Sequence, residues 1–198
     1  MHKMVRAPLR AIFSSPQFLF HAGQPGPLDD HALASRLSYF LWKTLPDAEL
    51  THLATEKKLT QPKVLAAQVE RMLDDPRSNR FINDFLDGWL HLSDIDATTP
   101  DPTLYPEYDN ELRQAMLAET RLYLRELLAK NLPARNFIKS DFSFVNRRLA
   151  RHYGMANISG EKMRRVALPP DSVRGGLMTQ ASILKITANG TLTSPVKR

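Results

Sequence analysis

The segment YDNELRQAMLAETRLYLRELLAK, residues 108–130, carries the strongest periodic pattern in the chain. Two carboxylates, Glu119 and Glu126, lie seven residues apart within a stripe of apolar side chains. That stripe recurs every three or four residues, a spacing that places its members on one face of an α-helix. Its members are Leu112, Ala115, Met116, Leu122, Tyr123 and Leu127. The segment therefore predicts a long helix that is buried along one side and brings acids into a core.

A buried carboxylate is costly unless a partner compensates its charge. Arg36 lies among apolar side chains in the stretch LASRLSYFLW, residues 33–42. We therefore expect Glu119 or Glu126 to pair with an arginine, and a structural ion pair between Arg36 and Glu119 is the favoured choice. The functional alternative is a carboxylate with a raised pKa that acts as a general acid or base.

Residues 77–92 predict a second helix with two distinct faces. One face is apolar and consists of Phe81, Ile82, Phe85, Leu86, Trp89 and Leu92. The opposite face carries Asp84, Asp87 and His91, whose side chains are able to bind a metal or position a water. The spacing matches no established metal motif, so we expect a solvated face and no metal. With Glu119 and Glu126, these three residues are the candidate catalytic groups.

The remaining pattern is mostly helical, with joints rich in proline. Asp29 or Asp30 is expected to cap a helix that reaches about Trp42, and Thr44 to cap the next. Short helices are expected near 133–138 and 145–153, a short strand over 162–168, and a helix over 176–186, with a hairpin at Asn189-Gly190 as the alternative to that last helix. The predicted fold class is mainly α: an irregular multi-helix domain with a small strand- and loop-rich basic C-terminal portion.

Charge is distributed unevenly along the chain. Residues 139–198 contain 11 Lys and Arg against 3 Asp and Glu, a net charge of +8, whereas residues 1–138 contain 16 against 18, a net charge of −2. We expect this basic third to contact adjacent domains of the same polypeptide. Nucleic acid is the least favoured partner, because the bases are not interleaved with stacking aromatics. The candidate interdomain or anion-binding residues are Arg147, Arg148, Arg151, Arg174, Lys197 and Arg198.

The composition excludes several classes of site within this chain. It contains no cysteine, which rules out disulfides, thiolate metal sites and a covalently attached c-type haem here, so no cofactor is expected. No apolar run approaches the roughly 18–20 residues of a membrane span. The N-terminal stretch is basic, but Pro8 and Arg10 interrupt the apolar residues that a signal peptide would need.

The last 25 residues, 174–198, contain four bases, three glycines and no acid. We interpret them as the start of a domain whose remainder is missing, so that their polar side chains and bases would meet partners outside this chain. On this interpretation Thr187–Arg198 should be the least well-packed part of the molecule. The preceding Arg174–Ile186 should still dock on the helical body.

Several strings, taken together and in order, resemble a known arrangement of domains. They are residues 33–42, 45–50, 144–154, 174–177 and 193–198, preceded by SPQFL at 15–19. The chain resembles the DUF1592 domain of planctomycete-type multidomain proteins with cytochrome-c-like domains. The start of a DUF1588 domain would follow it, and the tail of a DUF1595-like domain would precede it. The expected boundaries are residues 1–24 for the preceding domain or linker, 25–132 for the helical domain, and 133–198 for the truncated following domain.

The resemblance implies a non-catalytic helical module of a large exported bacterial protein in the periplasm or cell envelope. It also implies c-type haem elsewhere in the full-length protein, and a link to polysaccharide breakdown or electron transfer. Two alternatives stay open. One is an enzyme that acts on a polysaccharide through Asp/Glu pairs. The other is binding of an anion or nucleic acid by the basic C-terminal third.

Overall fold

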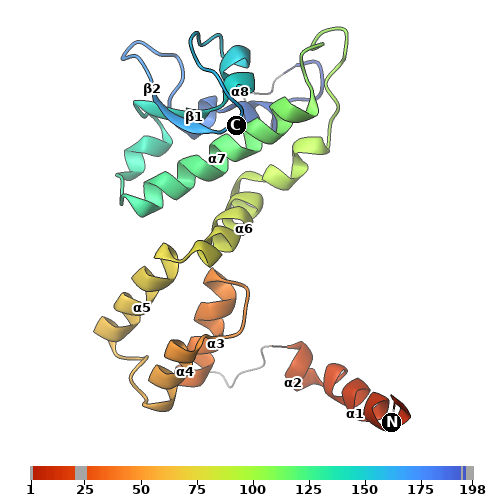
Figure 1. Cartoon of the computed structure of the whole chain (residues 1–198), viewed down its shortest axis with the longest axis vertical. Coiled ribbons are helices and arrows are strands. Elements are labelled where there is room, and N and C mark those ends of the chain that lie inside the picture. Colours follow the sequence, from red (N-terminus) through yellow and green to blue (C-terminus); the bar gives the residue numbers. More distant parts are fainter. Residues whose placement is uncertain (1, 21–25, 193, 195–198) are drawn as a thin grey trace. The chain divides into compact units, whose positions relative to one another are not determined.

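The computed structural model describes residues 2–20, 26–192 and 194, and the chain divides into two compact units, Met1–Arg71 and Met72–Arg198. Helices dominate both units, so the predicted mainly α class is confirmed (Figure 1). Among the described residues, the only sheet has two strands, and it belongs to the second unit.

Unit 1 contains α1 (His2–Phe13), α2 (Pro16–Leu19), α3 (Asp30–Leu41), α4 (Ala48–Thr55) and most of α5 (Pro62–Asp74). Asp29 caps α3 as predicted, since its carboxylate accepts the backbone N–H of Ala32 at 2.7 Å. The predicted cap of α4 at Thr44 is wrong. Asp47 takes that role and accepts the N–H of Leu50 at 3.0 Å, whereas the Thr44 hydroxyl donates to the carbonyl of Leu45. The helix begins after Pro46, so only Asp47 stands at the correct offset.

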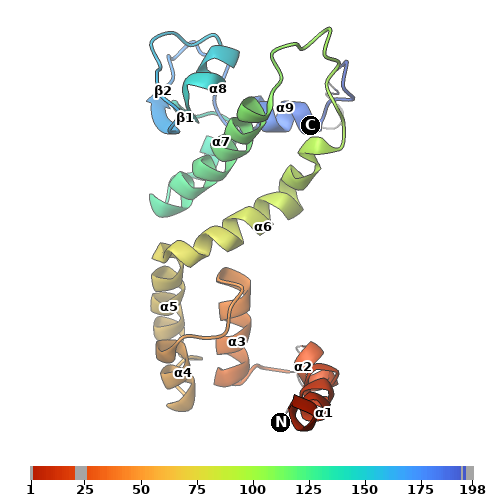
Figure 2. The same cartoon turned by 45° about the vertical axis from the view of Figure 1, so that its right-hand side comes forward.

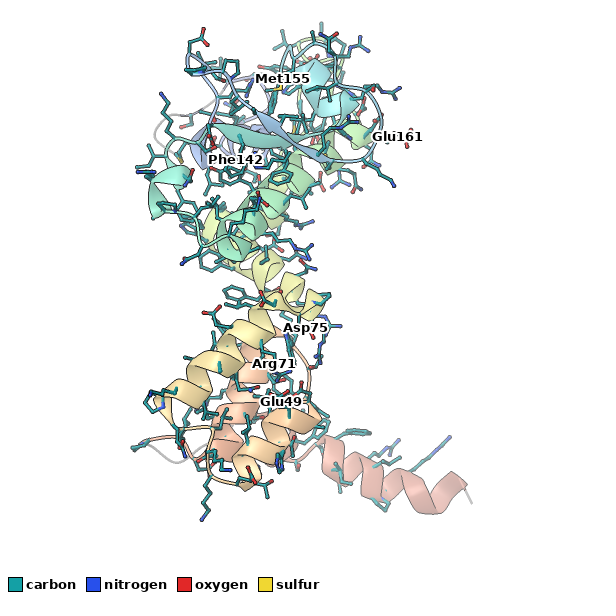
Figure 3. All side chains as sticks on the ribbon, turned by 60° about the vertical axis from the view of Figure 1, so that its left-hand side comes forward. Glu49, Arg71, Asp75, Phe142, Met155 and Glu161 are labelled. Carbon is teal, nitrogen blue, oxygen red and sulfur yellow. The ribbon has the colours of Figure 1, made fainter. Side chains whose placement is uncertain are left out.

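An arginine ties α4 to α5 within unit 1 (Figure 3). Arg71 of α5 lies 2.8 Å from the carboxylate of Asp47 and 3.4 Å from that of Glu49. Its guanidinium also stands 5.4 Å from the centre of the Trp42 ring, and that ring is fully buried. One side chain therefore joins the start of α4, the end of α3 and the last turns of α5.

Unit 2 is built around α6 (Asn79–Leu90) and α7 (Asn110–Ala129), which pack on each other. A 3₁₀ turn precedes α6 at η1 (Pro76–Ser78), and another follows it at η2 (Leu92–Asp96). The helix predicted over 77–92 stops at Leu90 because His91 adopts a left-handed conformation, with φ of 54°. The long helix predicted over 108–130 is α7, and Asp109 caps it by accepting the N–H of Leu112 at 2.7 Å.

The rest of unit 2 covers α7 with short elements (Figure 2). In chain order these are η3 (Ala134–Phe137), β1 (Phe142–Val145), α8 (Arg147–His152), β2 (Arg164–Ala167), η4 (Leu177–Thr179) and α9 (Ala181–Ile186). The strands pair antiparallel, with Phe142 opposite Ala167 and Val145 opposite Arg164. β1, α8 and α9 all contact α7. The expected strand is confirmed in β2, whereas β1 lies in a stretch for which no strand was predicted.

The helix preferred for residues 176–186 is present but shorter than expected. It begins at Ala181 after the 3₁₀ turn, and it ends at Ile186. A tight turn follows, in which the side-chain oxygen of Asn189 accepts the N–H groups of Thr191 and Leu192. The turn expected at Asn189-Gly190 therefore exists alongside the helix rather than instead of it.

The core of unit 2 forms along the predicted stripe of α7. Leu112, Ala115, Met116, Tyr123 and Leu127 are all buried, and Leu124 is buried in place of the predicted Leu122. One cluster joins Leu112 and Met116 to Val145, Leu149 and Ala181. Residues 174–186 thus dock on the helical body as predicted. The domain boundaries expected after residues 24 and 132 stay a prediction.

Candidate functional site

Glu119 lies inside the core of unit 2, in the middle of α7, and only 1% of its surface is exposed. The hydroxyl of Ser143, on β1, donates to one carboxylate oxygen at 2.5 Å. The hydroxyl of Tyr153, which ends α8, donates to the other oxygen through a short hydrogen bond. Both oxygens of this buried acid therefore have partners from elements distant in the sequence.

Tyr153 extends the network to the C-terminal segment. Its hydroxyl oxygen accepts the backbone N–H of Ala181, at the start of α9, at 2.8 Å. The guanidinium of Arg174 stacks over the Tyr153 ring, with its central carbon 3.6 Å from the ring centre. The same guanidinium donates to the carbonyl of Thr179 at 3.0 Å. Tyr153 thus links α7, α8, α9 and the loop that carries Arg174.

The residue after Glu119 makes a second buried contact with the same segment. The hydroxyl of Thr120 lies 2.6 Å from the side-chain oxygen of Gln180 and 2.6 Å from the hydroxyl of Ser182. All three residues are buried. Buried polar contacts from Glu119 and Thr120 therefore form a layer between α7 and the start of α9.

Burial is the largest influence on the pKa values of the titratable groups in and beside this layer. It raises the pKa of the Glu119 carboxyl to about 7, against the opposing effects of the Ser143 and Tyr153 hydroxyls and of the nearby Arg174 charge. Burial and the Glu119 charge together raise the pKa of the Tyr153 hydroxyl well above its usual value. Burial, followed by the charge of Arg174, lowers the pKa of His152. Chemically, the arrangement is able to hold a proton near neutral pH, but the carboxyl has almost no exposed surface.

Glu126 is partly buried and pairs with two cations instead of one. Its carboxylate lies 2.6 Å from Lys130 and 3.2 Å from Arg165 of β2. Arg36, the partner expected for Glu119, is exposed on α3 of unit 1. The pair of Arg36 with Glu119 joins residues of the two separate units and stays a prediction. The charged side chain recorded close to Glu119 within its own unit is Arg174.

The acids and the histidine expected on α6 are directed to different neighbours. Asp87 lies 3.9 Å from Arg121 of α7, His91 lies 3.8 Å from Asp94, and Asp84 is exposed. Within residues 2–20, 26–192 and 194, no three His, Asp or Glu side chains gather in a way that could hold a metal ion. Catalytic roles for Asp84, Asp87, His91, Glu119 and Glu126 stay predictions.

The candidate basic residues divide into separate groups. Arg147 and Arg151 are exposed on α8, whereas Arg148 pairs with Asp109 at 2.9 Å and donates to the carbonyl of Glu107. Arg174 belongs to the network described above. Lys197 and Arg198 lie outside the described residues. The interdomain or anion-binding role of these bases stays a prediction.

Lys185 of α9 is a further buried cation that the sequence pattern did not single out. Its ammonium donates to the carbonyl of Ile95 at 3.0 Å, and to the carbonyl and hydroxyl of Thr98 at 2.7 and 3.0 Å. Burial lowers its pKa. Two bases of the C-terminal segment, Arg174 and Lys185, therefore find partners inside unit 2, contrary to the expectation that such bases would need partners outside the chain.

Ser143 and Tyr153 were not foreseen as partners of Glu119, although both were visible in the sequence. They lie 24 and 34 residues from Glu119, and no local spacing relates them to it. The one available signal was the stripe position of Glu119, which requires a compensating donor without specifying which one.

No helix within the described part of the chain combines the length and the apolar character needed to cross a membrane.

Comparison with protein-family models identifies the family of this chain. The chain matches no curated protein and no solved structure. A family model described as "PSD4: Protein of unknown function (DUF1592)" matches residues 28–155, which include α7, β1 and α8. Because that match covers more than half of the chain, the protein belongs to the DUF1592 family of proteins of unknown function.

Proposed function

We propose that this chain is a non-catalytic helical module of a larger exported bacterial protein that carries c-type haem domains. In this proposal the module lies in the periplasm or cell envelope, and its basic C-terminal part contacts adjacent domains of the same polypeptide. A link to polysaccharide breakdown or electron transfer would belong to the whole protein rather than to this module. The proposal rests partly on the resemblance to planctomycete-type multidomain proteins.

The observation that carries the proposal is the closed network around Glu119. Within unit 2, both carboxylate oxygens accept hydrogen bonds from protein hydroxyls, and only 1% of the residue is exposed. A general acid or base has to reach a proton of its substrate directly or through one water. The geometry therefore favours a structural role for this acid, which holds α8 and α9 on α7.

The network also supports a role in presenting the next domain. Glu119, Ser143 and Tyr153 lie within the matched residues 28–155, whereas Ala181 and Arg174 follow them. The module thus fixes the direction in which the chain continues after the matched region. A rigid exit of this kind suits a segment that has to position a neighbouring domain.

Hydrogen exchange tests the proposal when this chain is compared with a longer form that includes the expected downstream domain. We expect the amides of α9 to be protected in both chains, because Tyr153 and α7 hold that helix in place. Residues 187–192 already make hydrogen bonds within this chain, so we expect partial protection here and a further gain in the longer chain, with the amides of α3 as an internal reference. Equal exchange of residues 187–192 in both chains would argue against a domain contact. The gene sequence beyond residue 198 gives a second check, since the proposal expects a Cys-x-x-Cys-His motif there, which is the attachment site of c-type haem.

A further inference from the structure

Unit 2 contains an open groove whose lining is rich in cations and does not include Glu119 itself. Its volume is about 560 Å³, within the roughly 300–1,000 Å³ range of small-molecule sites. Four of its lining side chains are basic: Arg135, Lys139, Arg165 and Arg174. Among the described residues that line it, Asp141 is the single acid. Such an excess of positive charge in a concave site attracts anions.

Two of these cations are available for a ligand. Among the residues that the structure describes, neither Arg135 nor Lys139 takes part in an ion pair, and both are exposed. They lie four residues apart, on η3 and the turn that follows it. Asp141, the one acid among the described lining residues, is too little negative charge to neutralise both. These two side chains therefore supply unpaired positive charge at one part of the groove.

The other two cations are held in place by the fold. Arg165 stacks on the Phe142 ring, with its central carbon 4.2 Å from the ring centre, and pairs with Glu126 at 3.2 Å. Arg174 is fixed by the Tyr153 ring and by the carbonyl of Thr179. Each guanidinium still has N–H groups beyond these contacts, because arginine carries five donors. Preorganised guanidinium groups are well suited to carboxylates and phosphates.

Glycines bring the backbone that carries Arg174 close to the turn that carries Lys139. Gly176 has a φ of 82°, and a Cβ there would collide with the carbonyl of Ile138. The neighbouring Gly175 has a φ of 140°, and a Cβ there would lie 2.5 Å from the carbonyl oxygen of Ser140. This close approach holds the free cations and the fixed cations around one groove.

We propose that this groove binds a small polyanion that carries at least two carboxylate or phosphate groups. One oxyanion would be held by Arg135 and Lys139, and a second by Arg165 and Arg174. The site differs from the exposed bases of α8, because Arg147 and Arg151 do not line the groove. Arg174 is shared with the Glu119 network, so the test below changes only Arg135 and Lys139, which lie outside that network.

Isothermal titration of the 198-residue chain with citrate, and separately with pyrophosphate, tests this site in phosphate-free buffer at low salt. We expect saturable binding of at least one probe, and binding that weakens as salt is raised. The double variant Arg135→Gln/Lys139→Gln should bind about tenfold more weakly or worse, because it loses two charge-assisted contacts. Binding of citrate alone would assign a carboxylate ligand, and binding of pyrophosphate alone a phosphate ligand.

A matched control removes the same charge elsewhere on unit 2. The double variant Arg147→Gln/Arg151→Gln changes two exposed bases of α8 and should keep the wild-type affinity within about twofold, since surface substitutions away from a site have small effects. The absence of saturable binding for both probes would overturn the proposal. An equal loss in both double variants would also overturn it, because it would indicate attraction to net charge rather than a site.

Discussion

Replacement of Glu119 by glutamine should make unit 2 more stable at alkaline pH and leave it nearly unchanged at acidic pH. Glutamine keeps the shape of the side chain, its oxygen is able to accept from Tyr153, and its amide is able to donate to the Ser143 hydroxyl. It cannot ionise. The wild-type carboxyl has to give up its proton inside the core, where burial raises its pKa from 4.5 to about 7.

The sign and size of the effect follow from proton binding. Between pH 4.5 and about 7 the folded state keeps a proton on Glu119 that the unfolded state has released, so wild-type stability falls as pH rises through this window. Below it both states are protonated, and above it both are ionised. A shift of this size corresponds to roughly 3 kcal/mol, at about 1.4 kcal/mol per pKa unit. The stability difference between the variant and the wild type should therefore change by about 3 kcal/mol in favour of glutamine between pH 4 and pH 8.

Urea unfolding across this pH range measures the difference, with hydrogen exchange of α7 amides used to observe unit 2 separately from unit 1. A ¹³C NMR titration of the Glu119 carboxyl gives the pKa directly. Glu111→Gln removes an exposed acid from the first turn of the same helix and should change stability by only a few tenths of a kcal/mol. The reasoning is refuted if the Glu119 carboxyl titrates near 4.5, or if the stability difference does not depend on pH.

Three further substitutions have defined outcomes in urea unfolding or hydrogen exchange. Tyr153→Phe removes a hydroxyl that both donates and accepts in the buried layer, and it should cost about 1–3 kcal/mol and speed exchange in α9; unchanged exchange would contradict this. Gly88→Ala should stabilise α6 by roughly 0.5–1 kcal/mol, because a Cβ there meets nothing within 4 Å. Gly176→Ala should instead destabilise unit 2, and by several times that amount. A neutral or stabilising effect of Gly176→Ala would contradict the close approach at Gly176. Asp47→Ala should cost unit 1 about 1–2 kcal/mol through loss of the α4 cap and of the Arg71 pair, and a neutral result would show that the cap contributes nothing.

The local pattern was sufficient to predict α7 and the burial of Glu119. Helical periodicity is a property of neighbouring residues, so the apolar stripe of residues 112–127 defined which face meets the core. Short elements were harder to predict. β1 contains four residues, too few to show alternation, and it is stabilised by its pairing with β2 and its packing on α7.

The partners of the buried acid could not be predicted in the same way. The cost of burial indicates that Glu119 needs donors, but hydroxyl groups satisfy that need as well as an arginine does. The pair with Arg36 joins residues of the two units and stays a prediction, while the donors observed within unit 2 are Ser143 and Tyr153. The groove presents a similar difficulty, because Arg135 and Arg174 come together only through the close approach at Gly176.

The hydrogen bond from Ala181 to Tyr153 also limits how this module could be exchanged between proteins. The family match ends at residue 155, yet the partner that satisfies the Tyr153 hydroxyl lies 28 residues further along the chain than Tyr153. A gene fusion that joined a new domain directly after residue 155 would expose Leu112 and Met116 to water, and it would leave the Tyr153 hydroxyl without the N–H of Ala181. The segment that is transferred intact therefore has to extend through α9, to Ile186 at least, if the fold is to form in the new protein.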